Sequence, residues 1–134
     1  MLTIKNIKKK SFFMLLAGLL ALLAGLADRI IVLYAGQVVE QAQTLALYKS
    51  PRHPYTIGLL QSIPRLDQKG HERLTPIDGI PPDLTNYPTG CPFAPRCRFA
   101  IEQCTQEDPS LEPVSAGHDV ACWVKPDGSE ILKR

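Results

Sequence analysis

The chain has 134 residues and a formal net charge of +2 at pH 7, and this length suits at most one ordinary domain. No basic stripe is interleaved with aromatic residues, so the composition gives no support for nucleic-acid binding. The 12 prolines fall after Lys49. Because proline removes a backbone donor and fixes φ, we expect a loop-rich second half, and such short segments usually need a metal or disulfide staple.

Residues 1–27 form the first of three predicted segments and combine a basic start with an apolar run. Lysines at positions 5, 8, 9 and 10 precede an uncharged stretch from Phe12 to Ala27. At about 1.5 Å per residue this stretch is a little short for a hydrocarbon core of ~30 Å. Its basic start and small residues at the end are typical of a secretory signal peptide. We expect a signal peptide or membrane anchor, with a buried or interface helix as the alternative.

Residues 28–63 form the second segment, which begins with a predicted β-hairpin. The β-branched run 30–34 has strand character. Gly36 can supply the positive φ of a turn, and 38–40 then returns as the second strand.

Two short helices are expected after the hairpin. Thr44 should be the N-cap of the first, which reaches Tyr48. Pro54 fits the first turn of the second, over 55–62, and His53 should anchor the preceding loop to the helix start by a hydrogen bond. The residues expected on one face of this second helix are Tyr55, Leu59 and Ile63.

Residues 64–134 form the third, looser segment. An edge strand is predicted over 73–77, where a proline is tolerated. A loop is expected at 80–83, one or two helical turns at 99–104, and a short strand at 120–124. The fold class that follows is a small α+β protein with a loop-rich C-terminal tail.

Four cysteines crowd into this tail with the spacing C-x5-C-x6-C-x17-C: Cys91, Cys97, Cys104 and Cys122. Such a group either ligates one metal centre or forms two disulfides. Zinc sites usually bring their ligands in closer pairs, whereas four thiolates around an iron–sulfur cluster span a larger group. The spacing matches no common ferredoxin pattern, so it leaves both metals open. Disulfides would require an oxidising compartment.

Four sequence stretches occur in the following order along the chain: "LAGLADRIIVLYAGQVVEQA", "SPRHPYTIGLLQSIPRLD", "RLTPIDGIPPDLTNYPTGCPFAPRCRFA" and "GHDVACWV". Together they resemble the C-terminal part of the ATP-binding subunits of oligopeptide and dipeptide ABC importers, from about residue 23 to 124. The family's His-Pro-Tyr motif is matched by His53, Pro54 and Tyr55, and its Cys-rich tail by the four cysteines.

The resemblance implies that the hairpin and helices are the remnant of an ABC ATP-binding domain, followed by a metal-stapled tail. It implies that Cys91, Cys97, Cys104 and Cys122 bind an iron–sulfur cluster, four-iron four-sulfur, with zinc as the runner-up. Trp123 would then shield the cluster from water, and Arg96 could offset its charge. The implied partners are transmembrane permease subunits and a second ATP-binding subunit, with the chain peripheral on the cytoplasmic face of the membrane.

The sequence also departs from the family. No stretch matches the phosphate-binding loop G-x-x-x-x-G-K-[ST], no Asp-Glu pair follows an apolar strand, and the Ser-Gly-Gly-Gln signature is absent. Residues 14–18, near the expected switch histidine, read MLLAG. We therefore expect a truncated or rearranged subunit with no catalytic residue, which would not bind ATP and magnesium or hydrolyse ATP alone.

Two alternatives come from other functional classes. The first is a small exported or membrane-anchored structural protein, with 12–27 as signal or anchor and the cysteines in disulfides. The second is an electron-transfer or redox-sensing module built on the same cluster.

Overall fold

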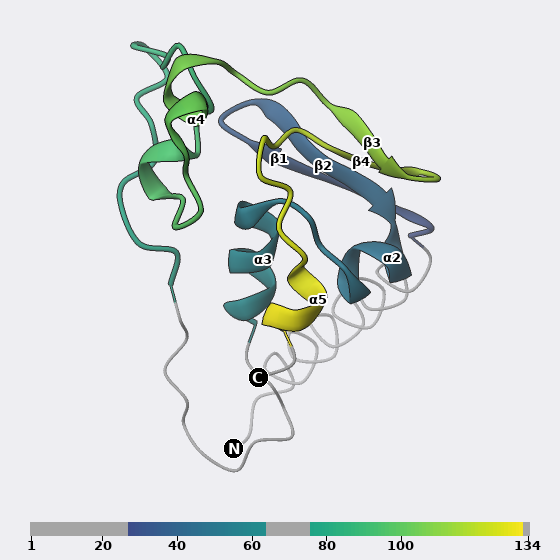
Figure 1. Ribbon diagram of the computed structural model, residues 1–134. Helices are drawn as coiled ribbons and strands as arrows, with labels where there is room; N and C mark the ends of the chain where they lie inside the picture. Colours follow the sequence, from purple (N-terminus) through teal and green to yellow (C-terminus); the bar gives the residue numbers. More distant parts are fainter. Residues whose placement is uncertain (1–26, 64–75, 133–134) are drawn as a thin grey trace, which may run out of the picture.

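The computed structural model describes residues 27–63 and 76–132, which form a small α+β fold around one antiparallel sheet (Figure 1). The strand order is β1-β2-β4-β3. The strands are β1 (Arg29–Tyr34), β2 (Gln37–Gln43), β3 (Glu112–Ser115) and β4 (His118–Val120). The helices are α2 (Thr44–Lys49), α3 (Pro54–Gln61), the 3₁₀ turn η1 (Ala94–Arg96), α4 (Glu102–Gln106) and α5 (Gly128–Ile131). In Figure 1, α2, α3 and α5 gather on one side of the sheet and α4 lies beside it.

The predicted hairpin is confirmed, and its second strand is longer than expected. Gly36 adopts the positive φ of the turn, at 82°, next to Ala35 at 48°. A β-bulge interrupts the pairing, because Val32 faces Glu40 while Leu33 faces Val38. The bulge breaks the normal alternation of strand faces, so Val39 and Glu40 are both buried.

The C-terminal tail completes the same sheet. Strand β4 pairs with β2 on one side and with β3 on the other, both antiparallel. The prediction of a strand over 120–124 was wrong in its bounds, because β4 ends at Val120. The backbone N–H of Ala121 still donates to the carbonyl of Val39, at 2.8 Å, and the chain then leaves the sheet. Strand β3 was not anticipated.

Two details of the helices also differ from the predictions. Gln43, not Thr44, is the N-cap of α2, and it provides no side-chain cap. The hydroxyl of Thr44 instead donates to the carbonyl of Ala27. Of the residues expected on one face of α3, Tyr55 packs against the core and Leu59 is 38% exposed, whereas Ile63 lies beyond the end of the helix at Gln61.

The remaining predictions for the tail are confirmed only in part. The loop at 80–83 is confirmed. Helix α4 begins at Glu102, three residues later than expected. Of the edge strand predicted at 73–77, residues 76 and 77 have no regular structure and the others lie outside the described residues.

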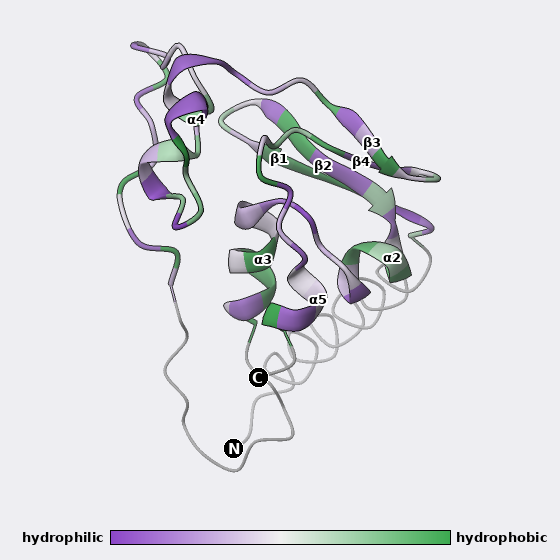
Figure 2. Cartoon of the chain, viewed as in Figure 1, coloured by the Kyte–Doolittle hydropathy of each residue, from purple (hydrophilic) through white to green (hydrophobic). Residues whose placement is uncertain are grey.

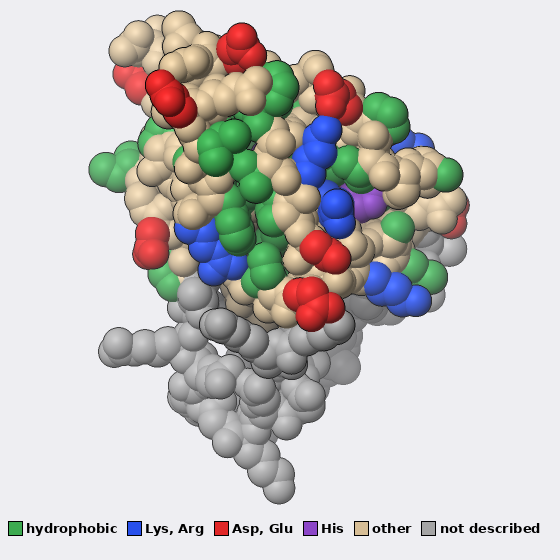
Figure 3. Space-filling view, viewed as in Figure 1, with side chains coloured by type: hydrophobic (Ala, Val, Ile, Leu, Met, Phe, Trp, Pro, Cys, Tyr) green, Lys and Arg blue, Asp and Glu red, His purple; other side chains and the backbone are tan. Residues whose placement is uncertain are grey.

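The core lies between the hairpin, α2 and the cysteine-rich loop. Its buried side chains are Val32, Tyr34, Val39, Ala42, Leu47 and Phe93. Hydrophobic and hydrophilic residues follow one another along β2 in Figure 2, as expected for a strand with one covered face. The face shown in Figure 3 has hydrophobic side chains near its centre, with acidic and basic side chains around them.

The signal or anchor predicted at 12–27 lies outside the described residues except for Ala27. Among the helices of residues 27–63 and 76–132, none has the length and apolar character needed to cross a bilayer.

Candidate metal centre

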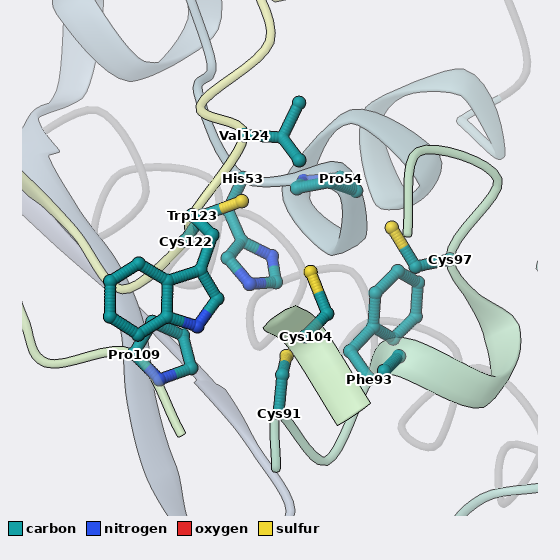
Figure 4. A pocket seen from close by; sticks show the side chains of 11 residues that line it. His53, Pro54, Cys91, Phe93, Cys97, Cys104, Pro109, Cys122, Trp123 and Val124 are labelled. Carbon is teal, nitrogen blue, oxygen red and sulfur yellow. The ribbon is translucent and has the colours of Figure 1, made fainter. Parts of the chain in front are cut away.

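The four cysteines come together around one pocket, although they lie on separate stretches of chain (Figure 4). Cys91 and Cys97 flank the turn η1, Cys104 lies in α4, and Cys122 follows β4. Their sulfur atoms point into the same space in Figure 4. Each of the four is a free thiol. The structure therefore places all four predicted site residues around the same pocket.

Backbone hydrogen bonds hold three of these cysteines in place. The N–H of Cys91 donates to the carbonyl of Cys104, at 2.8 Å, and ties the loop to α4. The approach is so close that a Cβ on Gly90 would lie 2.4 Å from the same carbonyl oxygen. Turn η1 then carries the chain to Cys97, whose N–H donates to the carbonyl of Ala94 at 3.1 Å. Glycine at position 90 is therefore a geometric requirement of the pocket.

The other walls of the pocket are mainly apolar. They are formed by His53, Pro54, Phe93, Ala94, Pro109, Trp123 and Val124. The cavity that they enclose with the cysteines has a volume of about 10 Å³. Trp123 is fixed there by its indole N–H, which donates to the carbonyl of Glu107 at 3.0 Å. Its position on the pocket is compatible with the shielding role expected from the sequence.

The thiols sit in surroundings that disfavour their charged form unless a cation is present. Burial raises the pKa of Cys91 to about 11, and it also raises the pKa of Cys97 and of Cys122. Backbone N–H groups near all three sulfurs act on the pKa in the opposite direction. They belong to Phe93 and Ala94 at Cys91, Phe99 at Cys97, and Val124 and Lys125 at Cys122. The N–H of Lys125 donates to the Cys122 sulfur at 3.3 Å.

Four thiols are a donor type that both zinc and iron–sulfur clusters take in proteins. Within residues 27–63 and 76–132, no three Cys, His, Asp or Glu side chains are arranged to hold a single metal ion. An iron–sulfur cluster takes thiolates at several iron atoms and therefore needs ligands that are further apart. Amide donors aimed at the sulfurs also tune clusters of this kind. In this structure four thiols line a mainly apolar cavity, and backbone N–H groups lie near three of them.

An aromatic cluster separates the pocket from the sheet. The ring of Phe93 lies 5.1 Å from that of Tyr34 and 5.5 Å from that of Tyr55, measured between centroids. Both tyrosines therefore contribute to packing, and Tyr34 is only 7% exposed. Phe93 was not singled out from the sequence, although it lies between the first two cysteines.

Arg96 does not line the pocket. Its guanidinium donates to the carbonyls of Ile77 and Asp78, at 2.9 Å each, and to the hydroxyl of Tyr34 at 3.3 Å. It therefore fastens the loop around residue 78 to the core.

The sequence reasoning missed Glu40, the most deeply buried charged residue of the site. Its carboxylate accepts from the backbone N–H of Arg52 at 2.7 Å and of His53 at 2.9 Å. It also makes a 2.7 Å hydrogen bond with Nε2 of His118. A carboxylate inside a strand that otherwise alternates was a signal that could have revealed it.

Comparison with known proteins relates part of this chain to a transporter family. Residues 39–104 match the family described as "Oligopeptide/dipeptide transporter, C-terminal region". The chain belongs to this family through that region.

Individual relatives support the same assignment. The oligopeptide transport ATP-binding protein OppD of Mycobacterium tuberculosis is 50% identical over 103 residues, or 77% of this chain and 17% of the relative. The dipeptide transport ATP-binding protein DppD of Bacillus subtilis is 46% identical over 111 residues, 83% of this chain and 33% of the relative. OppD of Haemophilus influenzae is 40% identical over 126 residues, 92% of this chain and 38% of the relative. The chain therefore spans well under half the length of these relatives.

Proposed function

We propose that this chain acts as the C-terminal part of an ATP-binding subunit in an ATP-driven importer of oligopeptides or dipeptides. The support is the identity of 40–50% to proteins named for oligopeptide and dipeptide transport. In this proposal the chain lies on the cytoplasmic face of the membrane, with transmembrane permease subunits and a second ATP-binding subunit as partners. Co-purification of tagged chain with permease subunits from membranes tests this placement, and recovery in a cleaved, exported form would refute it.

The 134 residues carry no phosphate-binding loop, so we propose that they do not hydrolyse ATP by themselves. Phosphoryl transfer needs positioned amides, a lysine and a metal ion around the phosphates. The role of this part is docking, stability or regulation of the subunit. ATP turnover by the purified chain, above that of a variant with a disrupted β1–β2 hairpin, would contradict the proposal.

We further propose that Cys91, Cys97, Cys104 and Cys122 hold an iron–sulfur cluster. The observation that carries this proposal is their convergence on one mainly apolar pocket, with backbone N–H groups near three of the sulfurs. When bound, such a group would supply a covalent cross-link between η1, α4 and the segment after β4. The residues themselves shape the pocket, exclude water through Trp123 and stabilise the thiolates.

Chemical analysis of protein purified without oxygen tests the cluster. We expect about four iron atoms and about four sulfides per chain, with visible absorption that is lost in each Cys→Ser variant. Thr105→Ser, a neighbouring change on the exposed side of α4, should keep both. Stoichiometric zinc without iron would replace the cluster by zinc, and two disulfides without metal would end the proposal.

A further inference from the structure

The histidine of the stretch "GHDVACWV", His118, does not line the sulfur-lined pocket. It is nevertheless only 4% exposed, and its Nε2 lies 2.7 Å from the carboxylate of Glu40, which is fully buried. Because a carboxylate only accepts hydrogen bonds, Nε2 is the donor. A buried polar pair that joins two strands can specify how they align, even where it adds little to stability.

Strand β4 is held on β2 over a short length. It has three residues, and its register pairs with β2 are Glu40 with Val120 and Gln41 with Asp119. His118 and Val120 are buried, whereas Asp119 is partly exposed. A slip by one residue would turn Asp119 inward and is excluded by this alternation. A slip by two residues keeps the same faces inward, so the apolar pattern does not exclude it.

The hydrogen bond between Glu40 and His118 distinguishes the native register from the two-residue slip. His118 stands two residues before Val120, the direct partner of Glu40, and such diagonal neighbours are within reach of long side chains. A slip by two residues would move the imidazole by about 7 Å along the strand and leave the buried carboxylate without this donor. Strand β3 is an edge strand that pairs with β4 alone, so it would move with β4.

The same slip would displace Cys122, which follows the last residue of β4 by two positions. Its sulfur would be carried by up to about 7 Å from the other three thiols. Another wall of the pocket would stay, because Glu40 also accepts from the backbone N–H groups of Arg52 and His53, at 2.7 and 2.9 Å. His53 and Cys122 both line the pocket (Figure 4). One carboxylate thus holds a pocket wall and the strand that leads to Cys122.

We propose that Glu40 and His118 are positioning residues, whose hydrogen bond fixes the register of β4 on β2 and thereby holds the Cys122 sulfur at the pocket. Neither side chain lines the pocket itself, so both act through the strand. The inference rests on the proposed cluster for its purpose, but the register of β4 and the position of Cys122 can be measured without iron.

Substitutions on the two faces of β4 separate the register from general stability. His118→Leu removes the donor and keeps an apolar side chain in the buried position, while His118→Gln retains an N–H₂ group that can donate to Glu40. Glu40→Gln combined with His118→Leu removes the same hydrogen bond without leaving a buried charge, in case His118→Leu alone does not fold. Asp119→Ala is the matched control. It loses the outer contacts with Gln41 at 2.7 Å and Arg29 at 3.5 Å and leaves the inner pair in place.

The first measurement is the alkylation rate of each thiol in the reduced, iron-free chain, followed by mass spectrometry. The ratio of the rate at Cys122 to the rate at Cys97 is compared between variants, because general loosening raises both rates together. We expect this ratio to change severalfold in His118→Leu and in the double variant, and to stay at the wild-type value in His118→Gln and Asp119→Ala. An unchanged ratio in both Leu variants overturns the positioning role, and so does an equal change in Asp119→Ala.

The second measurement observes the register directly, through cross-strand nuclear Overhauser effects in the iron-free chain. Residue 40 faces Val120 in the native register, and we expect this contact to be lost in the Leu variants and kept in His118→Gln. A Leu variant that keeps the contact with Val120 overturns the proposed role of the pair.

The loss of iron from the loaded protein to a chelator links the register to the cluster. We expect His118→Leu to lose iron about tenfold faster than wild type, as when outer-shell partners of metal ligands are removed. If wild type binds no iron while the alkylation ratio still changes in His118→Leu, the cluster fails and the positioning role survives. If iron is bound and the ratio is the same in every variant, the positioning role fails and the cluster survives.

Discussion

Glu40→Ala offers the sharpest test of how the pocket is supported. The carboxylate is 0% exposed and receives three hydrogen bonds, two from backbone N–H groups and one from His118. The substitution leaves these three buried groups without their partner. An unsatisfied buried group costs about 1–3 kcal/mol, and local relaxation recovers part of this. We expect a loss of about 4 kcal/mol in the free energy of unfolding, a large share of the roughly 5–15 kcal/mol typical of a domain.

Urea denaturation of the reduced, cluster-free chain measures this loss, with Trp123 fluorescence and far-ultraviolet circular dichroism as probes. Glu40→Gln keeps one carbonyl oxygen as an acceptor and should lose about half as much. Glu112→Ala removes an acid whose partner is Lys125 on the surface, and it should leave the midpoint unchanged. A Glu40→Ala variant within about 1 kcal/mol of wild type would show that the buried carboxylate contributes little to this fold.

Three further predictions concern the surroundings of the pocket. Gly90→Ala should abolish iron binding and lower the melting temperature more than Gly117→Ala, because its Cβ would collide with the backbone of Cys104, whereas at Gly117 nothing lies within 4 Å and only the positive φ of 71° is unfavourable for alanine. Arg96→Leu should destabilise the chain by about 2 kcal/mol through its lost hydrogen bonds, yet leave the iron content unchanged; a lower iron content would instead reveal a charge effect. Burial lowers the pKa of His53 from 6.5 to about 4, so the unfolded state binds more protons between these values. The free energy of unfolding of the cluster-free chain, measured by urea denaturation, should fall as the pH drops through this window, by about 3 kcal/mol in all, and His53→Gln should flatten the curve.

The hairpin and the start of α3 could be predicted from the sequence because their causes are local. A β-branched run on each side of Gly36 specifies the hairpin, and Pro54 preceded by His53 specifies the helix start. The convergence of the cysteines was also anticipated, as a shared task for four nearby thiols. Local patterns were sufficient for these features.

The return of the tail to the sheet could not be predicted, since its causes are distant along the chain. Strand β3 contains Glu112 and Pro113, which have low strand propensity, and it forms because β4 is available as a partner. The burial of Glu40 depends on the bulge opposite β1 and on donors from the loop at 52–53. Which face of α3 meets α5 was likewise not predictable, because helix periodicity alone does not identify the neighbour of a face.

The position of β4 inside the sheet has a consequence for how the protein can be made. This strand lies between β2 and β3 but follows both along the chain, so a growing polypeptide holds an open edge on β2 until β4 has been made. Exposed edges of this kind invite pairing with other chains. A premature stop before His118 would thus remove the centre of the sheet, and the shortened product should be prone to aggregation and degradation in the cell.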